Sequence, residues 1–120
     1  MPRKEDLRST QGTATVAPAI FGSAVPLLMT RHIYYMEVTN DFNGPNRLDI
    51  YDANPAAGGT LLKTVQMSIQ NQIIELPEGA HVESSIPFLK IRPAAAIVAA
   101  VWLQTSAGNA RVYMEYEDDY

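Results

Sequence analysis

The chain has 120 residues, a formal net charge of −4 and no cysteine. Its length suits a single domain with one modest core. The absence of cysteine excludes a disulfide scaffold, a thiolate metal site and a thiol nucleophile. The mild negative charge gives no electrostatic reason to bind nucleic acid or an anionic membrane. The longest apolar run, residues 93–103, is about half of the ~20 residues that span a bilayer, so we expect no membrane partner.

The N-terminal quarter differs in character from the rest of the chain. Residues 1–12 are polar and lack the apolar core of a signal peptide. The stretch that follows is apolar but contains Pro18 and Pro26. Because proline cannot donate to a central ladder, these pieces are predicted to be edge strands or an extended arm. We therefore divide the chain into an extended N-terminal arm, residues 1–30, and a β-sandwich domain, residues 31–120.

Short segments with strand character follow from residue 31 to the end. They cover residues 31–40, 47–53, 60–69, 72–76, 85–92 and 110–118. Alternation predicts that Ile33 shares a face with Tyr35, and that Leu61 shares a face with Val65 and Met67. Turn signals about every 8–12 residues predict an all-β fold, an eight-stranded antiparallel β-sandwich that is jelly-roll-like. An immunoglobulin-like strand order fits the strand count almost as well.

The most apolar segment, residues 93–103, admits two interpretations. A helix would begin at Pro93 and end before Gly108, which are favourable positions. Such a helix would be apolar on every side and would need full enclosure, for which a sandwich of this length has little room. We favour a strand over residues 97–105, which turns through residues 106–109 and pairs with the last strand, residues 110–117.

Both faces of this strand are apolar. The alternation places Val98, Ala100 and Trp102 on one face, and Ile97, Ala99, Val101 and Leu103 on the other. A sandwich strand normally keeps one face in water. A second layer must therefore cover the extra face, either the N-terminal segment of the same chain or another subunit. Burial of that face is worth several kcal/mol at ~25 cal/mol per Å².

No pattern typical of catalysis or metal binding is found in the sequence. His32 and His81 form no spaced pair, so a metal centre lacks its usual ligands. The serines lack the context of a nucleophile elbow, and no glycine-rich loop carries a phosphate-binding lysine. The acidic residues at 115–119 are predicted to be a solvated end, since no constrained loop arranges them around calcium. We expect no catalytic residue, no metal and no cofactor, and hence no enzyme.

The order of the strand phrases resembles a known family. After RHIYYMEVTND (31–41) come LDIYDA (48–53), GGTLLKTV (58–65) and the terminal VYMEYE (112–117). This order resembles the small β-sandwich, jelly-roll-like proteins that decorate or cement the capsids of tailed bacteriophages and similar viruses. The resemblance covers roughly residues 30–117. It implies a structural protein of the virion exterior, made in the host cytoplasm, often trimeric, with an N-terminal arm that reaches a neighbouring subunit or the shell.

Two functions follow as hypotheses. The first is a non-enzymatic structural protein that decorates and stabilises a viral capsid or similar shell, as a homo-oligomer, with a trimer favoured, bound to a major capsid or shell protein. Its apolar contacts are expected from Ile20, Phe21, Ile33, Tyr35, Ile97, Val101 and Leu103. Deletion of residues 1–30 should then leave a folded core. The second is a carbohydrate- or receptor-binding β-sandwich module, with Tyr51 and Tyr113 as candidate contacts.

Overall fold

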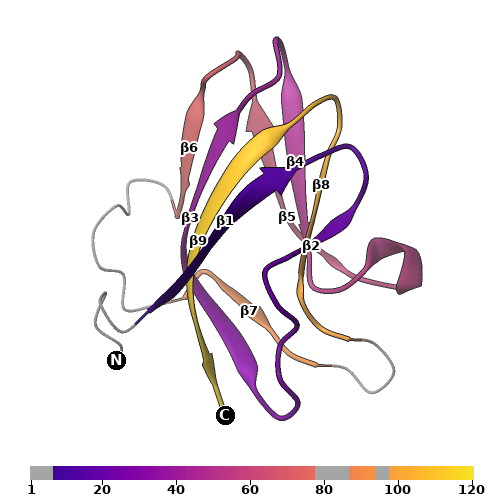
Figure 1. The fold of residues 1–120 in the computed structure, drawn as a ribbon, viewed down its shortest axis with the longest axis vertical. Helices are drawn as coiled ribbons and strands as arrows, with labels where there is room; N and C mark the ends of the chain where they lie inside the picture. Colours follow the sequence, from indigo (N-terminus) through magenta and orange to yellow (C-terminus); the bar gives the residue numbers. More distant parts are fainter. Residues whose placement is uncertain (1–6, 78–86, 94–97) are drawn as a thin grey trace.

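The protein is an all-β sandwich of two antiparallel sheets, seen in a computed structural model that describes residues 7–77, 87–93 and 98–120 (Figure 1). One sheet has the order β1-β9-β3-β6, with β7 also paired to β3, and the other has the order β2-β8-β4-β5. The strands are β1 (Arg8–Ala14), β2 (Ala19–Phe21), β3 (Thr30–Asn40), β4 (Asn46–Tyr51), β5 (Leu61–Met67), β6 (Ile73–Leu76), β7 (Leu89–Ile91), β8 (Val101–Thr105) and β9 (Ala110–Asp119). A short 3-10 helix, η2 (Pro55–Ala57), lies between β4 and β5.

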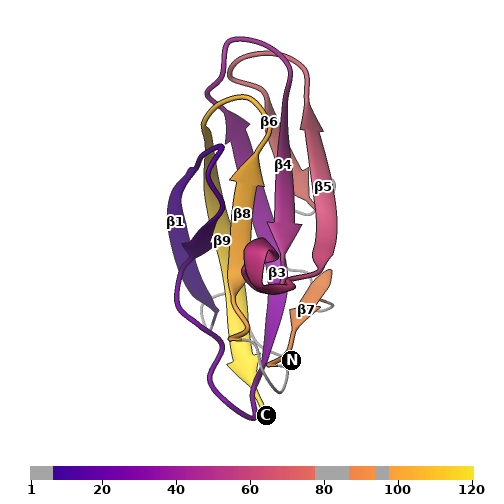
Figure 2. The same cartoon turned by 90° about the vertical axis from the view of Figure 1, so that its right-hand side faces the viewer.

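The strand order is that of a jelly roll. β1 pairs with β9, β2 with β8, β3 with β6 and β4 with β5, which are the pairs that one long hairpin would make. Wrapping such a hairpin into two sheets produces the jelly-roll order, which decides between the two strand orders that fit the sequence. The described residues form nine strands, where the sequence predicts eight. Figure 2 looks onto the outer face of the four-stranded sheet, which lies on the right in Figure 1.

The hydrophobic core fills the space between the two sheets. It takes every second residue of the long strands, as the burial pattern of β9 demonstrates. The largest contributors come from β3, β4, β8 and β9: Ile33, Met36, Val38, Leu48, Ile50, Val101, Leu103, Val112 and Met114. The period-two alternation in the sequence therefore predicts the core side of most strands.

The segment expected to be an arm is part of the sandwich from residue 8 onward. β1 pairs with β9 along its whole length, and β2 pairs with β8. Ala14, Phe21 and Val25 belong to the core. This differs from the predicted boundary at residue 30. Its physical reason is that Pro18 and Pro26 lie outside β1 and β2, so neither proline interrupts a ladder. Residues 1–6 lie outside the described residues.

The strand interpretation of the most apolar segment is confirmed over β8, but its predicted partner is wrong. β8 pairs with β2 and β4, while β9 lies in the other sheet. Residues 106–109 carry the chain between the sheets, and the Asn46 side chain holds them there. Its Oδ1 accepts from the backbone N–H of Ala107 (3.1 Å) and of Gly108 (3.3 Å), and its Nδ2 donates to the Gly108 carbonyl (2.9 Å). Residues 94–97 lie outside the described residues.

Candidate functional site

Four residues that the sequence assigns to contacts between copies lie inside the protomer. Phe21, Ile33, Val101 and Leu103 are core residues, so a partner cannot reach them while the sandwich is folded. Alternation separates the two faces of residues 97–105, but both faces are apolar, so polarity does not identify the one that meets the opposite sheet. The face of β8 that points away from the core carries Trp102.

The other three predicted contacts have different outcomes. Ile20 points away from the core and is 47% exposed. A register shift in β3 separates Ile33 from Tyr35, so Ile33 points inward while Tyr35 lies on the outer face of its sheet. Tyr35 is nevertheless buried by its neighbours on that face. Ile97 lies outside the described residues.

An apolar row crosses the outer face of the four-stranded sheet. The register pairs Ile20 with Trp102, Trp102 with Tyr51, and Tyr51 with Leu61, so each of the four strands contributes one side chain. We call these four residues the apolar row. Ile20 and Leu61, at its two ends, are about half exposed, and Tyr51 and Trp102 are partly buried.

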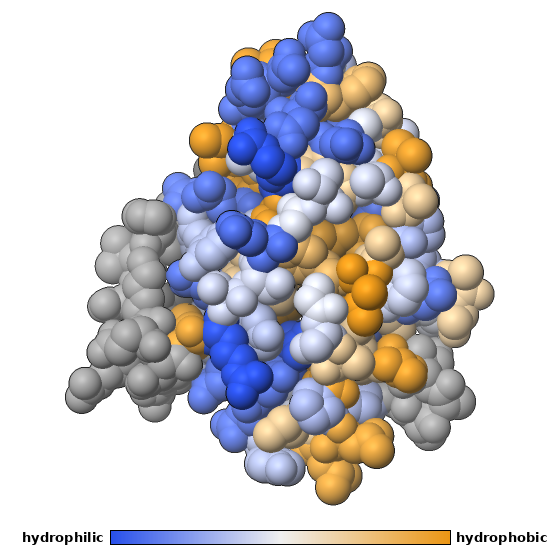
Figure 3. Space-filling view, in the orientation of Figure 1, coloured by the Kyte–Doolittle hydropathy of each residue, from blue (hydrophilic) through white to orange (hydrophobic). Residues whose placement is uncertain are grey.

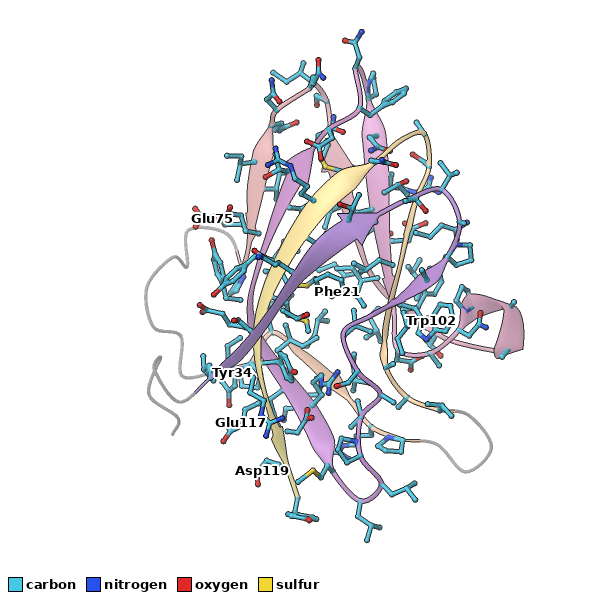
Figure 4. The ribbon with its side chains drawn as sticks, in the orientation of Figure 1. Phe21, Tyr34, Glu75, Trp102, Glu117 and Asp119 are labelled. Atoms are coloured by element: carbon cyan, nitrogen blue, oxygen red, sulfur yellow. The ribbon has the colours of Figure 1, made fainter. Side chains whose placement is uncertain are left out.

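The apolar row lies on the same face as the η2 loop. Figures 1 and 2 agree that η2 stands out from the outer face of the four-stranded sheet. Figure 4 shows Trp102 on the side of β8 that is turned toward η2. The loop is tied to the start of β8, because the Ala100 N–H donates to the Asp52 carbonyl (3.0 Å). The outer face therefore has a raised loop beside its apolar residues and is not flat.

Leu61 belongs to the apolar row because of a β-bulge. Simple alternation predicts Leu61 on the core side with Val65 and Met67. A register shift between β4 and β5 changes this, and Leu62 packs against the core in its place. The sequence contains no signal for this bulge, because Leu61 and Leu62 are both apolar.

A cluster of tyrosines and carboxylates lies on the outer face of the five-stranded sheet. We call it the tyrosine–carboxylate cluster, and its members are Tyr35, Glu37, Glu75, Tyr113 and Glu115. The Tyr35 hydroxyl lies 3.0 Å from Glu37 Oε2 and 2.9 Å from Glu75 Oε2. The Tyr113 hydroxyl donates to Glu115 Oε2 at 2.6 Å. The two tyrosine rings meet edge to face, with centroids 6.2 Å apart.

The surroundings of these tyrosines hold their hydroxyls in the neutral form. Burial raises the pKa of Tyr35 far above its ordinary value, and the neighbouring carboxylates raise it further. Burial and the hydrogen bond to a glutamate raise the pKa of Tyr113 to about 12. The pKa of Tyr34 is also raised, first by burial and then by Glu117 and Asp119, which Figure 4 shows on the same side of the sheet. These phenols are suited to hydrogen bonding rather than to nucleophilic attack.

A depression of about 320 Å³ opens beside the tyrosine–carboxylate cluster. It is lined by Gln11, Gly12, Thr13, Glu37, Thr39, Arg111, Val112 and Tyr113. Arg111 Nε lies 3.0 Å from both carboxylate oxygens of Asp41. The lining thus presents amide, hydroxyl, carboxylate and guanidinium groups next to one tyrosine ring. Such a mixture of polar groups around an aromatic surface suits a ligand rich in hydroxyl groups.

A buried arginine ties three segments together and has a structural role. Arg31 Nε and Nη2 donate to the two carboxylate oxygens of Asp118, at 2.7 and 2.9 Å. Its Nη1 donates to the Ser23 carbonyl at 2.7 Å. The guanidinium also lies 4.4 Å from the centre of the Tyr116 ring. Arg31 therefore joins β3, β9 and the segment that follows β2.

Neither a group of metal ligands nor a membrane-spanning helix is found in the part of the chain that is described. Within residues 7–77, 87–93 and 98–120, no three histidine or carboxylate side chains are arranged so that they could hold one metal ion. His32 lies on β3, and His81 lies outside the described residues. The same described residues contain no helix with the length and apolar character that crossing a bilayer requires. No protein-family model, no characterised protein and no solved structure matches this chain.

Proposed function

We propose that the protein is a non-enzymatic structural protein that associates with copies of itself and decorates and stabilises a viral capsid or a similar shell. The observation that carries this proposal is the apolar row. Single exposed apolar residues are ordinary on protein surfaces. An aligned set that spans every strand of a sheet is not, and contiguous apolar surface typically marks a contact with another molecule.

The fold is compatible with this function, but only because other proteins with the same architecture have such roles. Jelly-roll sandwiches occur in viral capsid proteins and also in lectins, so the fold alone does not choose between the two hypotheses. In the proposed assembly the protein lies on the exterior of the virion, against a major capsid or shell protein, and a trimer is the favoured state. The contacts between copies come from the outward side of β8, with Trp102, rather than from Val101 and Leu103.

The test is the oligomeric state of the purified chain, measured by light scattering during size-exclusion chromatography. We expect a stable oligomer for the wild type. Leu61→Glu places a charge at the end of the apolar row and should shift the chain toward monomer. Gln66→Glu is the matched control, because it adds the same charge on the same exposed strand but outside the row, and it should leave the oligomer intact. A wild-type chain that stays monomeric at high concentration contradicts the proposal.

A second candidate function is carbohydrate binding at the depression beside the tyrosine–carboxylate cluster. The observation in its favour is the set of hydroxyl, amide and carboxylate groups around the Tyr113 ring. Hydroxyl-bearing sugars are bound by polar groups of this kind together with an aromatic face. The two tyrosines suggested by the sequence are not part of one site, because Tyr51 lies in the four-stranded sheet and Tyr113 in the five-stranded sheet.

This separation supplies the control for a binding experiment. On a glycan array, Tyr113→Ala should abolish any signal of the wild type, because it removes the aromatic wall of the depression. Tyr51→Ala removes the same type of side chain from the opposite sheet and should leave the signal unchanged. Equal signals from both variants, or no signal from the wild type, would argue against carbohydrate binding.

A further inference from the structure

Two hydrogen-bonded pairs hold open the depression on the outer face of the five-stranded sheet. The Tyr113 hydroxyl donates to Glu115 Oε2 at 2.6 Å, and Glu115 lies further from Arg111 along β9. Arg111 instead donates through Nε to Asp41, which follows the end of β3. The two long side chains of β9 are thus drawn in opposite directions along the strand, and both line the depression that lies between them.

The floor of the depression offers polar groups that are available to a ligand. Thr13 of β1 and Thr39 of β3 are paired with Arg111 on its two sides, and Gln11 of β1 adds an amide. Figure 3 shows mainly hydrophilic residues over β1, which Figure 1 labels. Among the described residues, these three side chains form no hydrogen bond, and neither do the outer nitrogens of Arg111. Such groups bind the hydroxyls of a ligand by donating and by accepting.

Negative charge is uncompensated at the Tyr113 end of the depression. Glu37 and Glu115 each lie within hydrogen-bonding distance of a tyrosine hydroxyl, at 3.0 and 2.6 Å, and this partner carries no charge. Neither carboxylate forms an ion pair with any of the described residues, whereas Arg111 is paired with Asp41 at 3.0 Å. The cation that lines the depression is therefore neutralised, while the carboxylates are not.

The pKa of Tyr113 is a second sign of this negative potential. Burial, the hydrogen bond to Glu115 and the charges of Glu115 and Glu37 raise it to about 12. A potential that disfavours a phenolate favours a cation at the same place. The Tyr113 ring attracts a cation as well, through its negative face. The Tyr113 end of the depression thus suits a positively charged group, and its floor suits hydroxyl groups.

We propose that the depression binds a sugar unit that carries a protonated amino group. The inference rests on carbohydrate binding, the second candidate function, and specifies the chemistry of the ligand. The ammonium group lies beside Glu37 and the Tyr113 ring, where its hydrogen bond to the carboxylate is charge-assisted. The sugar hydroxyls bind Thr13, Thr39 and the outer nitrogens of Arg111.

Size and charge narrow the ligand further. The depression of about 320 Å³ is at the lower end of the ~300–1,000 Å³ of ligand pockets, which suits a single sugar ring. An acidic sugar is disfavoured, because its carboxylate would meet Glu37 while Arg111 is already paired with Asp41. A neutral sugar leaves the charge of Glu37 uncompensated.

Three matched probes isolate the contribution of the amino group. They are methyl glucosaminide, methyl N-acetylglucosaminide and methyl glucoside, which share one ring and differ only in one substituent. Binding to the full chain is measured by NMR chemical-shift titration at about pH 6, where an aliphatic amine is protonated. We expect the free amine to bind at least about tenfold more tightly than either neutral sugar, the effect of one hydrogen bond between charged groups.

Glu37→Gln is the decisive variant, and Glu117→Gln is its matched control. The glutamine at position 37 keeps the shape of the side chain and still accepts from the Tyr35 hydroxyl, so the melting temperature should be retained. The preference for the free amine should disappear, while the neutral sugars should bind as before. Glu117→Gln removes the same charge from the same sheet face, at a position that does not line the depression, and should leave the preference intact.

The remaining outcomes separate this inference from the candidate function on which it rests. If the wild type binds neither these sugars nor any member of a glycan array, carbohydrate binding itself fails. If it binds glycans without preferring the free amine, or if Glu37→Gln keeps the preference, the inference is refuted although carbohydrate binding stands. Equal losses in Glu37→Gln and Glu117→Gln would refute it too, because the attraction would then come from overall charge. If Nα-acetyl-lysine amide binds as tightly as methyl glucosaminide, the amine of a protein side chain replaces the amino sugar as the ligand.

Discussion

At the scale of single residues, Arg31 and Asp118 form a buried ion pair. The side chain of Arg31 is 1% exposed and that of Asp118 is 9% exposed. Removal of one partner from such a pair leaves an uncompensated buried charge. A second arginine pair, Arg111 with Asp41, is joined through Nε alone and lies at the surface, with 64% and 30% exposure. The two pairs therefore provide a matched comparison of burial.

We predict that Arg31→Met lowers the free energy of unfolding by about 3–5 kcal/mol. Arg111→Met should cost at most ~1 kcal/mol, as expected for an exposed pair. Addition of Asp118→Leu to Arg31→Met should recover part of the loss, since the unpaired carboxylate is then gone. Urea denaturation of the three variants measures these differences. Similar losses for the two arginines would refute a special role for the buried one.

The Tyr113 hydroxyl makes stability depend on alkaline pH. Its pKa is raised to about 12 in the folded protein, mainly by burial and by the hydrogen bond to Glu115, against about 10 in an unfolded chain. Between these values the folded state binds more protons than the unfolded state, so the free energy of unfolding falls as pH rises. The contribution is complete below about pH 10 and is lost as the pH rises through about 12.

We predict that Tyr113→Phe reduces this pH dependence. The variant keeps the ring that packs against Tyr35 but has no hydroxyl to titrate. Its free energy of unfolding should fall less steeply than that of the wild type between about pH 10 and 12. Urea denaturation at several pH values measures the slope, and absorbance near 295 nm follows tyrosinate formation. Equal slopes for the two proteins would exclude Tyr113 as a source of the dependence.

At the scale of elements, turns and bulges determine the register and the strand partners, which the apolar pattern of the sequence does not specify. Period-two alternation of apolar and polar residues predicts the strand character of β4 and β9, and β9 buries every second residue. The strand character of β8 is predicted instead from its β-branched and aromatic residues, because both of its faces are apolar. The apolar pattern does not predict the two bulges, which turn Tyr35 and Leu61 to the outer faces of their sheets. It also misassigns the partner of β8, because the signal in residues 106–109 is equally suited to a hairpin and to a crossing between sheets.

The crossing between β8 and β9 depends on a glycine. A Cβ atom at Gly108 would overlap the Phe42 ring, with its Cγ 2.8 Å away. We predict that Gly108→Ala lowers the free energy of unfolding by about 1–3 kcal/mol through overpacking. Phe42→Leu in the same chain should recover part of this loss, since it removes the overlapping ring atoms.

Gly12→Ala is the control for this substitution. Its Cβ would meet Phe21 Cε1 at 3.4 Å, which is an ordinary contact. The strand position favours alanine over glycine, so we expect a change smaller than ~1 kcal/mol. Thermal and urea denaturation measure the stability of both glycine variants. If Gly12→Ala lost more stability than Gly108→Ala, the contact with Phe42 would not control the crossing.

At the scale of the whole molecule, the N-terminal segment closes the sandwich. β1 forms the edge of one sheet against β9, and β2 forms the edge of the other against β8. Between these strands the Thr15 carbonyl accepts from the Thr105 N–H at 2.9 Å. The segment therefore belongs to both layers, and these contacts give no support to a core of residues 31–120 that folds without it.

We predict that deletion of residues 1–21 severely destabilises the chain. Loss of Phe21 from the core alone costs about 3–5 kcal/mol, which is a large share of the ~5–15 kcal/mol of a typical domain. The deletion also leaves one edge of β9 unpaired. Deletion of residues 1–6 leaves all described strands complete and should preserve the melting temperature. Circular dichroism during heating compares the two, and a cooperative, wild-type-like transition for the longer deletion would contradict the prediction.

The sequence predicts the fold more fully than it predicts the candidate site. Fold class follows from the spacing of turns and apolar positions, which are local properties. The apolar row depends on register across four strands, since Ile20, Tyr51, Leu61 and Trp102 are far apart in the chain. The tyrosine–carboxylate cluster likewise joins residues of β3, β6 and β9. Bulges and packing between the sheets set this register, so it cannot be predicted from a local sequence pattern.

The pairing of β1 with β9 has a consequence for synthesis on the ribosome. Roughly a hundred residues separate the two strands, so at about 5–20 residues per second β1 waits about 5–20 s for its neighbour. β3, the centre of the same sheet, also lacks β9 during that interval, and one side of its ladder stays open. Closure of the fold is thus a late, non-local event of the slow kind typical of β-sandwiches. A nascent chain with unpaired β1 and β3 edges is the form in which this protein is most open to chaperones and to aggregation.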